Sequence, residues 1–201
     1  MPKIVDHDHK RKLIVETAWG IIETEGIEKA SIRRIANEAG MSTGALRHYF
    51  SNQDELLLFI MEYFLARGKE RTEKKVWSKK PLTAVQETLL ELVPVDRDKQ
   101  TETSVWLVFA IRSLTSAALN TKKNELTEGE YILMEALLEI LIKAGFVNKD
   151  INIEIEKLRL SIMIEGLSIH ALLRPDIFTI EKTEQIIAHH LNEICNQSYN
   201  S

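Results

Sequence analysis

The segment of residues 31–50, SIRRIANEAGMSTGALRHYF, constrains the fold more than any other part of the chain. Serine is a favoured N-cap residue, so Ser31 and Ser42 predict two short helices, over residues 32–39 and 43–49. Helices joined by so short a turn cross at a steep angle. The crossing needs a small side chain, a turn residue with positive φ, and an aliphatic side chain pointing back into the junction. Ala36, Gly40 and Leu46 meet these needs, and their spacing predicts a helix-turn-helix.

Apolar residues recur at helical spacing along nearly the whole chain, and no stretch alternates like a strand. We therefore expect an all-α fold of about nine helices, over residues 8–25, 32–39, 43–49, 51–76, 81–92, 99–119, 128–144, 153–173 and 179–196. The pattern predicts an N-terminal three-helix head with the helix-turn-helix, residues 1–52, followed by a helical body, residues 53–201.

The composition favours a cytoplasmic location and no membrane association. No apolar run is long enough to cross a bilayer, the start lacks the apolar stretch of a signal peptide, and Cys195 is the only cysteine. The net charge of −4 divides into +1 for residues 1–50, with eight basic and seven acidic groups, and −5 for the rest. An acidic protein can still bind nucleic acid if its cations converge on one face.

The outward face of the second short helix is the candidate for reading double-stranded DNA. The predicted base-facing residues are Ser42, Thr43, Gly44, Ala45, Arg47 and His48. Arg47 can contact guanine O6 and N7, and Thr43 a base edge or a phosphate. The sugar–phosphate backbone is expected to meet Ser31, Arg33, Tyr49 and Gln53. The alternative is a helical hairpin inside a larger bundle, with Arg47 and His48 as solvated surface.

Residues from about 10 to 60 resemble the N-terminal domain of the TetR family of transcriptional regulators. The resemblance is carried by Ala18, Ile21-Ile22, Gly26, Ser31-Ile32, Ile35-Ala36, Ala39-Gly40-Met41-Ser42, Gly44, Leu46, His48-Tyr49-Phe50 and Asp54-Glu55-Leu56-Leu57. It implies an Ω-shaped homodimer with a DNA-binding head and a ligand-sensing, dimerising body. Two residues depart from the family pattern: Arg47 stands where Tyr is usual, and Gln53 where a phosphate-contacting Lys is usual.

The last two helices predict a dimer interface. The helix at residues 153–173 is apolar nearly all the way round, which suits a position between its own core and a partner subunit. The predicted interface residues are Ile155, Leu158, Ile162, Gly166, Ile169, Leu173, Ile187, Leu191 and Ile194. A purely intramolecular core is the alternative. Residues 165–175 also resemble the C-terminal helix of the BetI-like branch of the family.

Residues that could bind a ligand in the body are harder to identify. Trp106, Phe109 and Arg112 recur every three residues on one helix and could bind a small molecule, with Met163 and Glu165 as weaker candidates. The alternative is that the two aromatic residues belong to the core. No motif indicates an enzyme, a cofactor or a metal site. The sequence thus predicts a homodimeric, ligand-responsive repressor that binds a palindromic operator and is released by a small-molecule effector; a protein-binding helical adaptor is the alternative.

Overall fold

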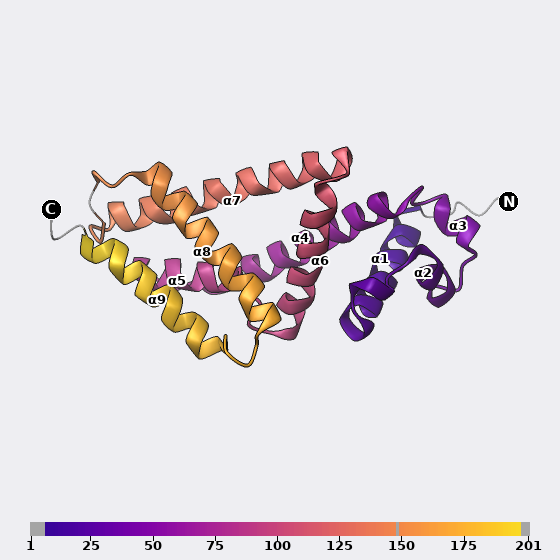
Figure 1. Cartoon of the computed structure of the whole chain (residues 1–201), viewed down its shortest axis with the longest axis horizontal. Helices are drawn as coiled ribbons and strands as arrows, with labels where there is room; N and C mark the ends of the chain where they lie inside the picture. The colour runs from indigo at the N-terminus through magenta and orange to yellow at the C-terminus, as the bar shows by residue number, and fades with distance from the viewer. Residues whose placement is uncertain (1–6, 148, 198–201) are drawn as a thin grey trace. The chain divides into compact units, whose positions relative to one another are not determined.

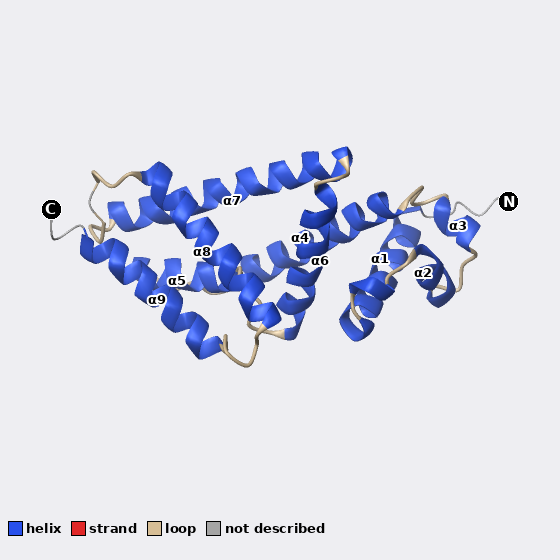
Figure 2. Cartoon of the chain, viewed as in Figure 1, coloured by secondary structure: helices blue, strands red, loops and turns tan. Residues whose placement is uncertain are grey.

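The computed structural model describes residues 7–147 and 149–197. These residues form nine α-helices and one short 3-10 helix and contain no strand, which confirms the all-α prediction (Figures 1 and 2). In chain order the helices are α1 (His7–Glu25), η1 (Ile27–Lys29), α2 (Ile32–Glu38), α3 (Thr43–Arg47), α4 (Gln53–Lys74), α5 (Pro81–Glu91), α6 (Arg97–Ser113), α7 (Ala117–Lys143), α8 (Ile153–Leu173) and α9 (Ile180–Gln197).

The chain folds into two compact units. The first contains the residues up to Arg71 together with Ser104–Asn120, and the second contains Thr72–Thr103 together with the residues from Thr121 on. The first unit extends past residue 52 because α4 packs on α1: the Tyr63 ring meets Trp19 edge-on, with centroids 6.1 Å apart. A functional boundary after residue 52 remains a prediction.

A side-chain capping motif starts α4 two residues later than the predicted start at residue 51. The side chain of Asn52 accepts the backbone N–H of Glu55 at 2.9 Å. The Glu55 carboxylate in turn accepts the N–H and the hydroxyl of Ser51, both at 2.7 Å, and these hydrogen bonds lower the pKa of Glu55. Asn52 and Glu55 have the spacing of a capping box, which Ser51 and Asp54 share, so local sequence could not choose between them.

The boundary between α6 and α7 differs from the predicted one. The sequence suggested helices over residues 99–119 and 128–144, but α6 ends at Ser113 and α7 begins at Ala117. The amides of Leu114 and Thr115 bond back three residues, to the carbonyls of Ile111 and Arg112, and this tightened turn ends α6. The polar start of α7 is anchored by the fully buried Leu119, and Gly129 lies within the helix although glycine disfavours that conformation.

The core of the second unit joins α5, α7, α8 and α9. Its buried side chains include Val85, Leu89, Met134, Leu141, Leu160, Ile164, Leu167, Ile187, Leu191 and Ile194. Helix α5 packs directly on α9. Burying this apolar surface stabilises the unit by about 25 cal/mol for each Å² removed from water.

Candidate nucleic-acid interface

Helices α2 and α3 are built by the local signals read in the sequence. Ser31 accepts the N–H of Arg34 at 3.2 Å, and Ser42 accepts the N–H of Ala45 at 3.0 Å, so both predicted caps are confirmed. Gly40 has a φ of 65°, the left-handed conformation that the turn needs. These contacts produce two short helices that pack on each other across a tight turn.

The junction between the two helices is held by a small apolar core. Ile35 and Leu46 are completely buried and Ala36 is buried, as the spacing predicted. The amide of Met41 donates to the carbonyl of Ala36 at 2.8 Å, which pins the turn to α2. Because α3 has only five residues, it depends on such tertiary contacts for its orientation.

The outward face of α3 carries exposed polar side chains. Thr43, Gly44, Arg47 and His48 are exposed, as is the cap residue Ser42, whereas Ala45 and Tyr49 are half-buried. Within residues 7–147 and 149–197, the side chains of Thr43, Arg47 and His48 make no hydrogen bond or ion pair. The helix ends at Arg47, two residues before the predicted end. Its donors are therefore free to contact an external partner.

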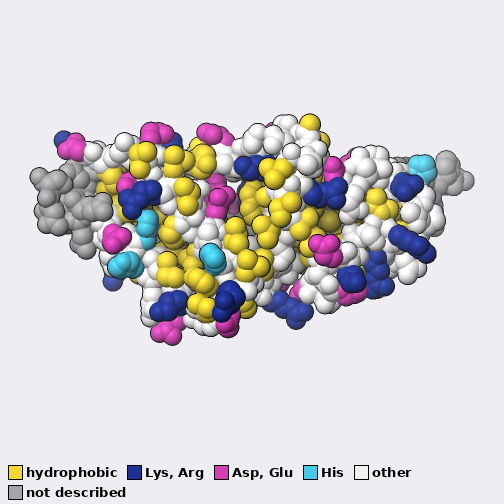
Figure 3. Space-filling model, viewed as in Figure 1, with side chains coloured by type: hydrophobic (Ala, Val, Ile, Leu, Met, Phe, Trp, Pro, Cys, Tyr) yellow, Lys and Arg dark blue, Asp and Glu magenta, His cyan; other side chains and the backbone are white. Residues whose placement is uncertain are grey.

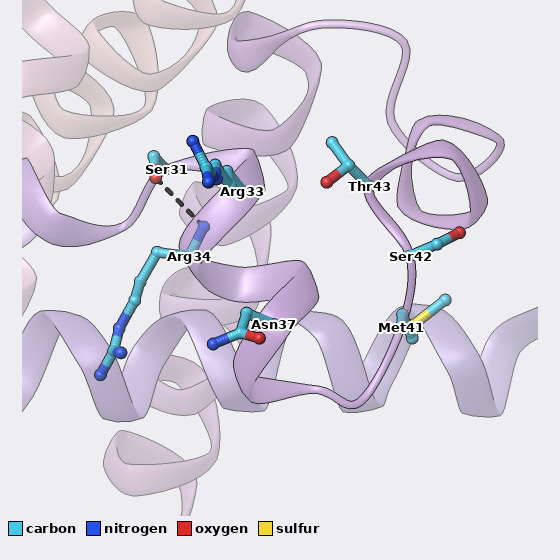
Figure 4. Close-up of a pocket in the computed structure, with 7 residues that line it drawn as sticks. All are labelled: Ser31, Arg33, Arg34, Asn37, Met41, Ser42 and Thr43. Carbon is cyan, nitrogen blue, oxygen red and sulfur yellow. Dashed lines mark hydrogen bonds between the residues drawn. The ribbon is translucent and has the colours of Figure 1, made fainter.

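A hollow of about 490 Å³ lies between α2 and the start of α3 (Figure 4). It is lined by Ser31, Arg33, Arg34, Asn37, Met41, Ser42 and Thr43. Asn37 and Met41 were not among the predicted contact residues. Asn37 lies four residues after Arg33, so the sequence held a signal that both occupy one helix face.

The two neighbouring arginines of α2 differ in their partners. Arg34 pairs with Glu25 at 2.7 Å and with Glu38 at 3.4 Å, and Figure 4 shows its side chain extending away from α3. Arg33 is exposed and has no ion-pair partner in the described part of the chain. Arg33 thus supplies an uncompensated positive charge beside the hollow, whereas the charge of Arg34 is already balanced.

Gln53 does not extend outward as a phosphate contact would. Its side-chain amide donates to the carbonyl of Ala30 at 3.2 Å, and the residue is half-buried. Next to it, Asp54 forms an ion pair with Arg112 of α6, within the same unit. The side chain of Gln53 therefore ties the start of α4 to Ala30, which precedes the N-cap Ser31 of α2, and its predicted phosphate contact would require breaking this bond.

The candidate ligand residues are divided between the two units. In the first unit, Trp106 and Phe109 stack with ring centroids 6.0 Å apart, and Phe109 is completely buried. Arg112 is engaged by Asp54, so its charge is partly neutralised. Met163 and Glu165 belong to α8 in the second unit, where Met163 packs against the core and Glu165 is exposed. Within the first unit, Trp106 and Phe109 are brought into contact.

The predicted dimer residues divide into two groups. Five large apolar residues of α8 are exposed, and Gly166 lies half-exposed among them: Ile155, Leu158, Ile162, Ile169 and Leu173. Hydrophobic side chains gather on the face of α8 and α9 seen in Figure 3. By contrast, Ile187, Leu191 and Ile194 of α9 are buried in the core of their own unit. Their placement in an interface was wrong, because a fully buried side chain has no surface to offer a partner.

Neither a membrane-spanning helix nor a metal-binding cluster occurs in the described residues. None of these helices is long and apolar enough to cross a membrane. No group of three or more His, Cys, Asp or Glu side chains there is arranged to hold a metal ion.

The geometry defines a helix-turn-helix protein with a helical body, whose α3 presents exposed donors that have no partner among the described residues. The sequence matches the profile of the bacterial regulatory proteins of the tetR family over residues 14–60, and that of the C-terminal part of BetI-type transcriptional repressors over residues 81–196. The chain therefore belongs to the TetR family of DNA-binding transcriptional regulators.

Individual relatives agree with this assignment. The chain is 36% identical over 199 residues to the HTH-type transcriptional regulator PksA of Bacillus subtilis, covering 97% of this chain and 94% of the relative. It is 26% identical over 197 residues to BetI of Vibrio atlanticus, covering 96% and 95%. A transcriptional regulator of Rhodococcus shares the fold, with a TM-score of 0.76, 22% identity and coverage of 94% and 97%. A regulator from Saccharomonospora viridis, solved with choline, has a TM-score of 0.73, 23% identity and coverage of 92% and 95%.

Proposed function

We propose that this regulator is a homodimeric repressor that binds a palindromic operator through α2 and α3 and is released by a small-molecule effector. The observation that carries the proposal is the exposed face of α3, where Thr43, Arg47 and His48 have no partner among the described residues. A guanidinium at Arg47 can donate two hydrogen bonds to guanine, one to O6 and one to N7. Thr43 can donate to a base edge or a phosphate.

The hollow beside α3 supports a second set of contacts. It is lined on one side by Arg33 and Asn37 of α2 and on the other by Thr43 of α3. A DNA strand that enters the hollow would therefore meet hydrogen-bond donors from both helices. We assign Ser31, Arg33 and Tyr49 to the sugar–phosphate backbone, which sets the register without reading bases. Asn37 can pair with adenine N6 and N7, or with a phosphate.

Selection of bound sequences from random duplex DNA tests the DNA-binding part of the proposal. A palindromic consensus with half-sites about one helical turn apart, roughly 34–36 Å, is expected from a two-fold dimer. Affinity should fall steeply with salt, because phosphate neutralisation releases counterions. A protein-binding adaptor would enrich no sequence and show no such salt dependence, and that result would refute the proposal.

The exposed apolar face of α8 supports homodimerisation. Ile162 is 69% exposed and Leu173 is 62% exposed, and burying such side chains against a second copy removes apolar surface from water. Half-exposed Gly166 lets two helices approach closely. Ile162→Glu should give monomers in sedimentation and lose operator binding. Ile132→Glu is the matched control, because Ile132 is 61% exposed on α7 and lies outside the proposed interface; dimers of Ile162→Glu would contradict the assignment.

The half-buried ring of Trp106, which stacks on the completely buried Phe109, is the proposed contact for the effector. Choline is the first probe, because a regulator with the same fold was solved with it, and aromatic faces attract quaternary ammonium groups. We expect choline to raise the thermal midpoint and weaken operator binding, and Trp106→Ala to abolish both effects. Trp77→Ala serves as a control, since Trp77 belongs to the second unit and faces Lys75. An operator affinity unchanged by choline would exclude it as the effector.

A further inference from the structure

Arg11 of α1 lies over two aromatic rings at the junction between α3 and α4. Its guanidinium carbon is 5.4 Å from the centroid of Phe50 and 5.1 Å from that of Phe59. The two rings contact each other, with centroids 5.2 Å apart. The charge of Arg11 also helps to lower the pKa of Glu55, whose carboxylate caps the start of α4, although the hydrogen bonds from Ser51 contribute more.

Phe50 connects this cluster to α3. It follows α3 by three residues, is completely buried, and its amide donates to the carbonyl of Leu46 at 3.1 Å. Leu46 is in turn the side chain that anchors α3 in the junction core. Any movement of the Phe50 ring is therefore transmitted to α3 through one hydrogen bond and a short segment of backbone.

We propose that Arg11 is a positioning residue for DNA recognition: by holding Phe50 against Phe59 it fixes the orientation of α3, without touching DNA itself. The proposal rests on the role of α3 proposed above. A five-residue helix has too few internal hydrogen bonds to keep its own orientation. Loosening its anchor lowers the fraction of molecules in the binding-competent arrangement, and the observed affinity falls by the same factor.

A second arginine in the same helix pair provides a matched control. Arg67 of α4 lies 4.9 Å from the centroid of Trp19 and 5.9 Å from that of Tyr63. This contact has the same chemistry and joins the same two helices, about two turns further along both, away from Phe50. Losing either contact should weaken the packing of α1 on α4, but only the contact at Arg11 is connected to α3.

The test compares Arg11→Met and Arg67→Met in full-length protein, using the selected operator and a series of salt concentrations. Methionine keeps an apolar stem over the rings and removes the guanidinium. We expect Arg11→Met to bind the operator more weakly, by up to about 30-fold, which is the limit set by losing such cation–π contacts, with an unchanged slope of log K against log[salt]. Both variants should lower the thermal midpoint by a similar amount. Arg67→Met should nevertheless bind the operator like the wild type.

Hydrogen exchange provides a readout that does not depend on DNA. The amides of Leu46 and Phe50 should exchange faster in Arg11→Met than in Arg67→Met. A salt slope shallower by about 0.9 in Arg11→Met would show a phosphate contact and overturn the positioning role. An unchanged affinity, or an equal loss in both variants, would overturn it too. Failure of the wild type to bind DNA would instead overturn the proposed function, and this inference with it.

Discussion

Replacing Gly40 by alanine isolates the backbone demand of the turn between α2 and α3. Gly40 has a φ of 65°, and a Cβ built there would meet no atom within 4 Å. The added methyl group therefore causes no clash, and its cost is that of the left-handed conformation for an L-residue, about 1–2 kcal/mol. For a chain of this length, that corresponds to a thermal midpoint lower by about 2–8 °C.

Gly129→Ala adds the same methyl group at a glycine that has a helical backbone conformation instead of the left-handed one. Gly129 lies inside α7, and a Cβ there would also meet no atom within 4 Å. Alanine should stabilise this position by about 0.5–1 kcal/mol, because it restricts the unfolded chain and favours the helix. Thermal unfolding followed by circular dichroism measures both changes.

A third substitution at the turn sharpens the test. Asparagine tolerates the left-handed conformation better than alanine, so Gly40→Asn should lose less stability than Gly40→Ala. A Gly40→Ala variant as stable as the wild type would refute the backbone demand at Gly40. Shifts of the thermal midpoint in the same direction for Gly40→Ala and Gly129→Ala would refute it too.

Three further outcomes are expected. Arg47→Ala should reduce discrimination at one base pair of the operator by about 1–3 kcal/mol in a binding titration, and unchanged discrimination would exclude a base contact. Arg33→Ala should make the salt slope of DNA binding shallower by about 0.9, whereas Arg34→Ala, whose charge is already paired with Glu25 and Glu38, should leave it nearly unchanged; equal slopes would contradict the difference. Burial raises the pKa of Glu130 above its ordinary 4.5 and favours the neutral carboxyl, so the stability contributed by this group is present at low pH and is lost as pH rises through the raised pKa. Glu130→Gln should therefore raise the thermal midpoint at neutral pH, and this gain should fade as the pH falls toward about 4.5. Glu128 is exposed on the same helix, so Glu128→Gln should show no such dependence on pH.

The helix-turn-helix could be predicted closely because its determinants are local. Ser31 and Ser42 cap through hydrogen bonds to residues only three positions away, and Gly40 is required by the conformation of its own backbone. Such signals are complete within a few residues of sequence. The ends of α3, α4, α6 and α7 were predicted less well, because several nearby residues could serve equally as a cap or a turn.

The surfaces of the last two helices show where periodicity stops being informative. Ile162 of α8 and Ile187 of α9 both lie on apolar stripes with the same spacing, yet the first is exposed and the second is in the core of its own unit. An apolar stripe indicates that a helix face is to be buried, but it does not say whether the burying surface belongs to the same chain or to another.

The sequence by itself determined the all-α class, the caps and turn of the helix-turn-helix, and the identity of the donors on α3, since these depend on contacts between near neighbours. Tertiary structure alone decided that Gln53 turns back to Ala30, that Arg34 is neutralised while Arg33 is not, and that Arg11 lies over Phe50. Each of these outcomes depends on segments from different parts of the chain meeting in space. Packing geometry, which periodicity does not encode, decides which side chains remain free for a partner.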